Sequence, residues 1–374
     1  MKVSILQENL AKGLNTINRF ITTKAQLPIL NNVLIKTDQG RLKLSATNLE
    51  TGINFWLGAK VEEEGEICVP AKNLTEYITS LPVGKVDLEM KENLLKINSG
   101  SYQAQFLTSP SVEFPVIPTL EKKAEINLSF KDLSSAITQV AFAASQDEGR
   151  PVLTGVLLKV KKQSLFLVAT DGYRLSVKEI KDLKEIEKIK ETEELLIPAR
   201  ALTEVGKIMS NSENESTLGL TITPKNNQII FSTSEVEIIS RLIEGKFPDF
   251  EKIIPDKRKT KIIIDTDSLL QAVRTTSIFA REAANIIKVE VSDSKMEISA
   301  NNPQMGENKI KLEVKTEGEG GKIAFNSRYL LDFLSSAKTD LVSLEIGDSL
   351  SPGVFSLAND SSYLHVIMPI RVQE

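Results

Sequence analysis

Three stretches of this chain end a strand-like run in the same way. Residues 42–48 read LKLSATN, residues 165–171 read LFLVATD and residues 296–302 read MEISANN. Between the expected helices, apolar and polar side chains mostly alternate, as in residues 85–90 (KVDLEM), which is typical of a strand that buries one face. The three stretches recur at a period of roughly 125 residues, which indicates an internal repeat.

An amphipathic helix is expected before each of these stretches, because apolar residues fall there at helical spacing. Asp267 and Ser268 are the expected N-cap of the third helix. The apolar positions are Leu6, Leu10, Leu14, Ile17 and Ile21 in the first copy, Leu133, Ile137, Val140 and Ala144 in the second, and Leu269, Val273 and Ala280 in the third.

A second marker predicts another helix later in each copy. It reads VPA at 69–71, IPA at 197–199 and AFN at 324–326, and Phe-Pro pairs close the first two copies at 114–115 and 247–248. Strands that alternate between the helices favour antiparallel sheets. We therefore expect an α+β fold of three tandem repeats, each with two helices and roughly eight antiparallel strands. Charged links suggest domain limits of 1–122, 123–256 and 257–374.

The amino-acid composition gives little support for an enzyme. The 374 residues include one histidine, His365, and one cysteine, Cys68, so a His/Cys metal cluster cannot be assembled from one chain. There is no phosphate-binding loop and no nucleophile-elbow sequence. We expect no catalytic residues and no cofactor. A carboxylate site that uses a metal, as in a nuclease, remains the alternative.

The chain also looks like a cytoplasmic protein. Its apolar runs are short, its N-terminus lacks the apolar core of a secretory signal, and a single cysteine cannot form an internal disulfide. The net charge of −4 argues against coating DNA through bulk charge. Any contact with DNA must therefore come from locally arranged basic side chains.

Tandem repeats whose sheets join edge to edge leave one open edge at each end of the chain. Residues 102–108 (YQAQFLT) are the candidate edge of the first repeat. A second chain could pair its far end there, head to tail, and such contacts close into a ring if the rotation per unit is right.

Five further stretches, in order along the chain, carry a resemblance to a known family. They are LPILNN at 27–32, ATDGYRL at 169–175, FPDF at 247–250, ANNP at 300–303 and MPIRV at 368–372. The chain resembles the DNA polymerase III beta subunit family, the bacterial sliding clamps, over its whole length. The resemblance implies a non-enzymatic homodimeric ring that encircles duplex DNA and tethers polymerases and the clamp loader for processive replication.

The family binds short linear peptides of its partners in a groove between its second and third domains. A histidine commonly stands in the family where this chain has Tyr173, and an arginine where it has Lys252. Carried over by position, the groove would include Leu153, Thr170, Gly172, Tyr173, Arg174, Leu175, Pro248, Ile253, Asn326, Tyr329, Leu350, Val366, Met368, Pro369, Ile370 and Arg371.

The resemblance also places the helices on the inner wall of the ring and a dimer contact at its ends. Weak contacts with phosphates suffice there, because enclosure rather than affinity retains the ring on DNA. The expected DNA-binding residues are Lys12, Arg19, Lys24, Lys72, Arg150, Arg200, Lys207, Arg274 and Arg281. The expected dimer contact joins Phe106 and Leu107 of one chain to Ile278 and Phe279 of the other. A scaffold of similar repeats that never encloses DNA is the competing interpretation.

Overall fold

A computed structural model describes most of the chain. The described residues are 1–21, 27–120, 124, 126–181, 183, 194–210, 216–223, 227–255, 259–282 and 284–371. Lys24, the charged links expected near 122 and 256, and most of the charged stretch between 181 and 194 lie outside them.

The first repeat has two helices and nine strands within the described residues. Its elements are β1 (Lys2–Leu6), α1 (Gln7–Ile17), β2 (Asn32–Asp38), β3 (Arg41–Thr47), β4 (Thr51–Gly58), β5 (Lys60–Glu63), β6 (Glu66–Pro70), α2 (Ala71–Ser80), β7 (Lys85–Lys91), β8 (Leu94–Ser99) and β9 (Tyr102–Leu107).

The second repeat has two helices and eight strands in its described part. They are β10 (Ile126–Ser129), α3 (Phe130–Val140), β11 (Gly155–Lys161), β12 (Ser164–Thr170), β13 (Arg174–Ile180), β14 (Glu194–Pro198), α4 (Ala199–Ser210), β15 (Thr217–Thr223), β16 (Gln228–Ser232) and β17 (Val236–Arg241).

Within its described residues the third repeat, like the first, has two helices and nine strands. They are β18 (Thr260–Asp265), α5 (Thr266–Ala280), β19 (Ile286–Ser292), β20 (Lys295–Asn302), β21 (Gly306–Glu313), β22 (Lys315–Glu317), β23 (Gly321–Asn326), α6 (Ser327–Ser336), β24 (Leu341–Ile346), β25 (Gly353–Leu357) and β26 (Asp360–Ile367). The predicted α+β fold of three similar repeats is confirmed.

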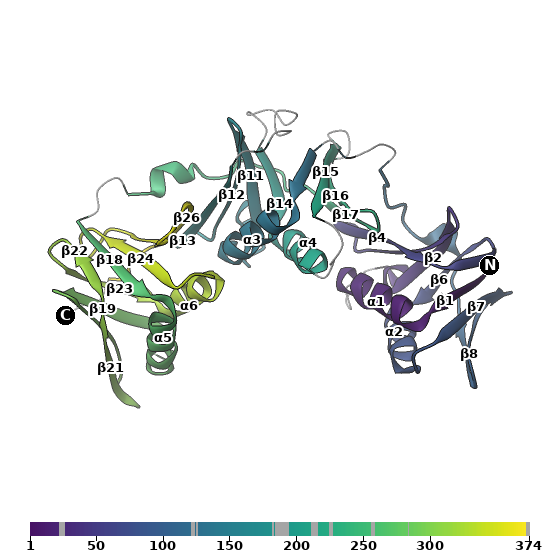
Figure 1. Ribbon diagram of the computed structural model, residues 1–374, viewed down its shortest axis with the longest axis horizontal. Coiled ribbons are helices and arrows are strands. Elements are labelled where there is room, and N and C mark those ends of the chain that lie inside the picture. The colour runs from purple at the N-terminus through teal and green to yellow at the C-terminus, as the bar shows by residue number, and fades with distance from the viewer. Residues whose placement is uncertain are drawn as a thin grey trace. The chain divides into compact units, whose positions relative to one another are not determined.

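The helices bury most of the positions that the sequence predicted, although Leu6 lies in β1 and is 54% exposed, and Ile21 lies beyond the end of α1. In the first repeat Leu10, Leu14 and Ile17 are fully buried, and α1 packs against α2 beside the sheet (Figure 1). In the third repeat α5 packs in the same way against α6. The expected N-cap of α5 is wrong by two residues. Asp265 is the cap, because its carboxylate accepts a hydrogen bond from the Ser268 backbone N–H at 2.8 Å.

Two long antiparallel sheets run across the boundaries between repeats. An eight-stranded sheet has the order β10-β15-β16-β17-β4-β3-β2-β6, so β17 pairs with β4 of the first repeat. A nine-stranded sheet has the order β14-β11-β12-β13-β26-β25-β24-β18-β22, so β13 pairs with β26 of the third repeat. The chain accordingly divides into two compact units that share the second repeat, 1–131 with 204–242, and 132–203 with 243–374.

Each repeat covers the strand before its second helix with the segment that follows its last strand. Ser109 and Cys68 exchange backbone hydrogen bonds in the first repeat, and the Ile243 N–H donates to the Leu196 carbonyl at 2.7 Å in the second. In the third repeat the Ile370 N–H donates to the Ala324 carbonyl at 2.8 Å. The C-terminal segment therefore covers the strand before the second helix of the third repeat, as the connecting segments do in the other two repeats.

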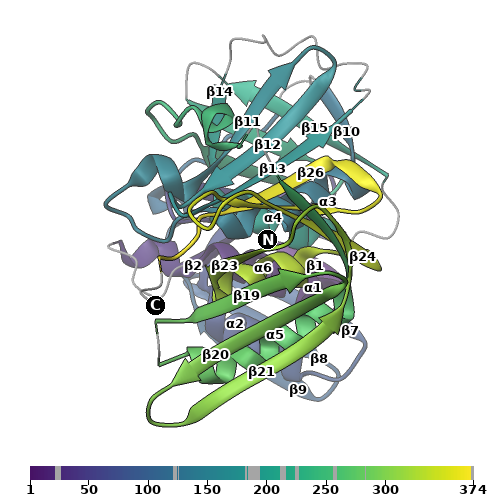
Figure 2. The ribbon, with the colours of Figure 1, turned by 90° about the vertical axis from the view of Figure 1, so that its left-hand side faces the viewer.

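Two shorter sheets end in strands with an open side. β9 is an edge of the sheet β5-β1-β7-β8-β9, as predicted for residues 102–108, and β21 is an edge of the sheet β21-β20-β19-β23 (Figure 2). Side chains of β9 face solvent, with Tyr102 51% and Leu107 75% exposed. An exposed edge of this kind favours pairing with another strand.

Candidate functional site

The turn between β12 and β13 is fixed by its own side chains. The Thr170 hydroxyl accepts from the Gly172 N–H at 3.1 Å and donates to the Arg174 carbonyl at 2.6 Å. One Asp171 carboxylate oxygen accepts from the N–H groups of Tyr173 and Arg174 at 2.9 and 3.0 Å. Gly172 has φ of +93°, which side chains disfavour. The turn leaves Tyr173 60% exposed.

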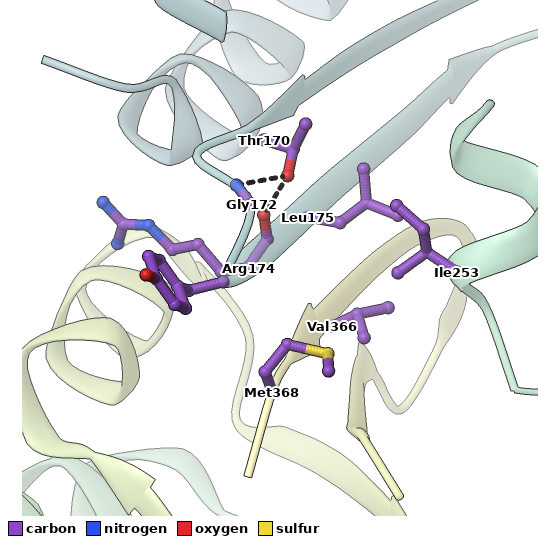
Figure 3. Close-up of a pocket in the computed structure, with 8 residues that line it drawn as sticks. Thr170, Gly172, Arg174, Leu175, Ile253, Val366 and Met368 are labelled. Carbon is purple, nitrogen blue, oxygen red and sulfur yellow. Dashed lines mark hydrogen bonds between the residues drawn. The ribbon is translucent and has the colours of Figure 1, made fainter. Parts of the chain in front are cut away.

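A small open pocket lies beside this turn (Figure 3). Leu175 and Val366 form its floor and are each 1% exposed, while Ile253 and Met368 stand on its walls. Thr170, Gly172, Tyr173 and Arg174 complete the lining. Its volume of about 200 Å³ includes space open to solvent. A shallow apolar depression of this kind suits one or two side chains of an extended ligand.

The FPDF stretch holds one wall of the pocket in place. Phe247 and Phe250 are buried at 4% and 6% exposure in a cluster that includes Leu175 and Val366. Phe250 begins a short 3-10 helix, Phe250–Ile253, at whose end Ile253 reaches the pocket. The two aromatic anchors therefore position Ile253.

The C-terminal segment supplies the opposite wall. The Met368 N–H donates to the Tyr173 carbonyl at 2.9 Å, and two residues later the Ile370 N–H donates to the Ala324 carbonyl. Pro369, which has no N–H, lies between these two donors. The segment is thus fixed at the turn on one side and at β23 on the other.

Arg174 is a bridge inside the molecule rather than a free cation on the rim. Its side chain is 9% exposed and lies over the Tyr329 ring at 4.6 Å. It donates to Asp171 at 3.1 Å, to Asp332 of α6 at 2.5 Å and to the Phe142 carbonyl at 2.7 Å. Tyr173, Arg174 and Leu175 all line the pocket, but their side chains lie in different surroundings. Tyr173 points outward, Leu175 is buried, and Arg174 is held by acids and a carbonyl.

His365 lies fully buried in the sheet that carries the pocket. Its Nδ1 is hydrogen-bonded to the Ser176 hydroxyl at 2.6 Å, and its ring stacks on Phe333 at 5.3 Å. Burial, with a smaller effect of the Arg174 charge, lowers the pKa of His365 to about 3. The imidazole is therefore neutral at physiological pH.

The pocket gathers eight of the sixteen residues expected in the groove. Asn326 caps α6 by accepting from the Arg328 N–H at 2.9 Å, and Leu153 lies in the 3-10 helix Pro151–Thr154. Pro248, Leu350 and Arg371 are exposed outside the lining. Sequence reasoning missed Phe142 and Asp332 as supports of Arg174. Asp332 carries a detectable pattern, because the sixth residue of the second helix is acidic in every repeat.

The described residues expected to meet DNA are all exposed. Two of them are already paired with Glu204, since Arg19 lies 3.3 Å and Lys207 2.8 Å from its carboxylate. Arg150 differs from the rest of this set. It donates to Asp147 at 2.9 Å and to the Asp171 carbonyl at 3.2 Å, so it stands against the pocket turn.

The described residues bring together no group of three His, Cys, Asp or Glu side chains that could hold a metal ion. Among the same residues, no helix combines the length and apolar character that a bilayer crossing requires. Cys68 is buried, and burial raises the pKa of its thiol to about 12.

Three like units on shared antiparallel sheets, with an apolar pocket in the sheet that joins the second and third, define a protein built from tandem α+β repeats. Comparison with known families is more specific. Residues 1–118, 127–249 and 251–371 match the N-terminal, central and C-terminal domains of the DNA polymerase III beta subunit. The chain belongs to the DNA polymerase III beta subunit family.

Its relatives agree in sequence and in fold. A beta sliding clamp of Staphylococcus aureus is 30% identical over 99% of each chain. The crystal structure of the DNA polymerase sliding clamp from Bacillus subtilis matches with a TM-score of 0.91 and 28% identity over the full length of both chains. The DNA polymerase III beta subunit of Thermotoga maritima matches with a TM-score of 0.90 at 28% identity, again over both full lengths.

Proposed function

We propose that this protein is a DNA sliding clamp, a homodimeric ring that encircles duplex DNA and tethers polymerases without chemistry of its own. One observation carries the proposal. The third strand after the first helix pairs with the last strand of the next repeat at both internal junctions, β4 with β17 and β13 with β26. The equivalent strands at the two ends of the chain remain as open edges. They are β21, the third strand after the first helix of the third repeat, and β9, the last strand of the first repeat.

A second copy would satisfy both edges. If β21 of one chain joins β9 of another, the two chains have two identical junctions and six like repeats. Heterologous contacts of this kind form a closed ring when the rotations sum to a full turn. The four expected dimer residues are compatible with such a contact. Leu107 and Ile278 are 75% and 49% exposed, and Phe106 and Phe279 are half-buried.

The domain limits proposed for the three clamp units are 1–122, 123–256 and 257–374. The matches to the three family domains, at 1–118, 127–249 and 251–371, support this partition.

Duplex DNA would meet exposed basic side chains on the helices. Such contacts attract any sequence weakly and weaken as salt is added. The net charge of −4 means that enclosure, rather than affinity, would retain the ring. A protein with this role would act in the cytoplasm, on the DNA of the nucleoid.

The pocket beside Tyr173 would receive short peptides from polymerases and from the clamp loader. Its floor is apolar, and its methionine wall can adapt to different side chains. The nearby cations are paired within the chain, Arg174 with Asp332 and Lys252 with Asp249 at 2.9 Å. Peptide affinity should therefore depend on apolar burial more than on charge.

Peptide binding can be tested with a fluorescent peptide from the clamp-binding end of a replicative polymerase. Met368→Ala and Tyr173→Ala should each weaken binding by about tenfold, since one well-buried apolar contact contributes on the order of 1–2 kcal/mol. Val116→Ala is the matched control, because Val116 is 94% exposed and lies outside the lining. Equal affinity of all four proteins would contradict the pocket assignment.

A DNA-cleaving enzyme is the alternative from another class. The purified protein should leave duplex and single-stranded DNA intact with magnesium or manganese present. Cleavage that a carboxylate substitution abolishes would contradict the clamp assignment.

A further inference from the structure

The turn between β3 and β4 has the same hydrogen bonds as the turn beside the open pocket. The Thr47 hydroxyl accepts from the Leu49 N–H at 3.0 Å and donates to the Thr51 carbonyl at 2.8 Å. The Asn48 side-chain oxygen accepts from the N–H groups of Glu50 and Thr51 at 3.0 and 2.7 Å. Each of these four bonds has its counterpart in the turn between β12 and β13. The two turns are therefore equivalent parts of two repeats.

Leu49 takes the place of Gly172 in this turn. Its φ is +75°, near the +93° of Gly172, in the left-handed region that side chains disfavour. The Glu50 carbonyl accepts from the Arg241 N–H at 2.9 Å, which is the counterpart of the bond that fixes Met368 at the open pocket. The chain thus builds the same arrangement at its first junction, where β4 pairs with β17, although a leucine has to adopt a glycine conformation.

The floor of the open pocket also has a counterpart at the first junction. Leu175 and Val366 are directly opposite each other at the second junction, where β13 pairs with β26. The equivalent opposed pair at the first junction is Gly52 and Ile239. Directly opposed residues of antiparallel strands carry their side chains on the same face. Gly52 therefore leaves unfilled the space that Leu175 fills with its side chain.

Ile117 of the connecting segment lies at this space. A Cβ atom placed on Gly52 would be 3.2 Å from the Ile117 Cγ2 atom. Ile117 is half-buried, whereas its neighbour Val116 is 94% exposed. At the open pocket an apolar side chain of this kind would have to come from a ligand. At the first junction the chain supplies it.

A buried polar pair holds the connecting segment on the sheet. The Asn54 amide donates to the Pro118 carbonyl at 3.3 Å, and the Glu237 carboxylate accepts from the Leu120 N–H at 3.3 Å. Asn54 and Glu237 are 0% and 8% exposed and lie opposite each other where β4 pairs with β17. The segment is thus fixed by its backbone on the C-terminal side of Ile117.

The equivalent pair at the second junction is apolar, and its connecting segment takes another path. Val177 is opposite Leu364 there, and both pack in one cluster with Ile253 and Ile254. Five residues separate the Phe-Pro and Ile-Pro pairs in this segment, and they include the 3-10 helix that carries Ile253 to the pocket wall. One residue, Val116, separates the same pairs in the first segment. The shorter segment has no room for such a helix and runs directly over the sheet.

We infer that the first junction contains a second copy of the pocket, and that the chain itself occupies it. Residues 115–120 form a strap, and Ile117 of the strap is the bound apolar side chain. The ligand class is an extended apolar segment, supplied in cis. The strap leaves one open pocket per chain, and its displacement exposes a second. The comparison with a peptide site rests on the proposed function of the open pocket, whereas the position of Ile117 does not.

Thiol labelling tests the strap without a peptide. In full-length Gly52→Cys the new thiol lies under Ile117 and should react slowly with a maleimide. Adding Ile117→Ala should raise the labelling rate by at least about tenfold, because the side chain that limits access is gone. Adding Val116→Ala, which truncates the exposed neighbour, should leave the rate unchanged. Equal rates in the three proteins would overturn the strap.

Cys68 serves as the internal control of the labelling. It lies in β6 of the same sheet, is buried, and has a thiol whose pKa burial raises to about 12. It should stay unlabelled in all three proteins, which shows that the sheet is intact while the rate at position 52 changes.

Peptide stoichiometry tests the second copy of the pocket. Gly52→Leu/Ile117→Ala removes the side chain of the strap and supplies a floor residue of the same type as Leu175. Calorimetric titration of this full-length variant with the polymerase peptide should give two peptides per chain instead of one. The second site should be about tenfold weaker, because Arg241 stands in the place of Met368 and buries less apolar surface.

The titration separates this inference from the proposed function. Val116→Ala should bind one peptide per chain, like the unmodified protein. One peptide per chain in Gly52→Leu/Ile117→Ala as well would overturn the second copy of the pocket and leave the open pocket standing. Absence of binding to every protein would contradict the peptide pocket itself, and the labelling rates would then decide alone whether Ile117 occupies the first junction.

Discussion

The C-terminal segment offers the sharpest perturbation of the pocket. Ile370→Pro deletes one N–H donor and leaves the carbonyl of Ala324, which is 6% exposed, without that hydrogen bond. An unpaired buried backbone group costs about 1–3 kcal/mol. Met368 is two residues away and is otherwise fixed by its bond to the Tyr173 carbonyl, so loss of the second bond frees the wall that Met368 forms.

If the whole cost falls on ordering this segment, peptide affinity should drop by about 5-fold to about 150-fold. Fluorescence anisotropy with the labelled polymerase peptide measures the drop. Hydrogen exchange should show faster exchange of the Met368 amide in the same variant. Ile370→Ala removes most of the side chain but keeps the donor, and it should bind the peptide more tightly than Ile370→Pro.

The repeat supplies a matched control. Ser109→Pro deletes the equivalent donor in the first repeat, where the Ser109 N–H donates to the Cys68 carbonyl at 2.9 Å. It should lower stability in the same way and leave peptide affinity within about twofold of the unmodified protein. Unchanged peptide affinity in Ile370→Pro, with the Met368 amide now exchanging freely, would refute the reasoning that this segment builds the pocket.

Two further predictions concern the groups beneath the pocket. His365 is the one histidine of the chain and stays neutral when folded, with a pKa of about 3, whereas the unfolded group titrates near 6.5. Its contribution to stability is complete above pH 6.5 and declines as the pH falls toward 3, by about 1.3 kcal/mol between pH 7 and pH 5.5. Urea unfolding of His365→Asn should lack this decline, and an identical pH dependence in both proteins would contradict the assignment. Arg174→Lys cannot reach Asp171, Asp332 and the Phe142 carbonyl with one ammonium group, so it should lower the unfolding free energy by about 2 kcal/mol. Asp332→Asn should then have a smaller effect in Arg174→Lys than in the unmodified protein, whereas additive effects would show that the two groups do not act together.

Local patterns predicted most of the repeat. Helical spacing identified most of the buried faces of the first helices, and strand alternation identified the sheets. The boundaries were less predictable, because several polar residues near a helix start can serve as its cap. Asp265, rather than Asp267 or Ser268, caps α5 since its carboxylate is the one that meets a free N–H of the first turn.

Half of the residues that the sequence predicted for the groove line the pocket, but the sequence did not predict how their side chains are arranged. Leu175 and Val366 are distant in sequence and meet because β13 pairs with β26 across a repeat boundary. Nothing in the local sequence of Arg174 distinguishes a solvent-facing cation from one held by a helix carboxylate and a carbonyl. Alignment of the repeats reveals part of this arrangement, since Asp332 shares its place with Glu76 and Glu204.

Retention on DNA tests the central claim most directly. The protein, assembled by a clamp loader on nicked circular DNA, should remain bound after free protein is removed, because a closed ring cannot leave a circle. Cutting the circle once should release it, because the ring can then slide off an end. Equal retention on circular and linear DNA would contradict a ring that holds DNA by enclosing it.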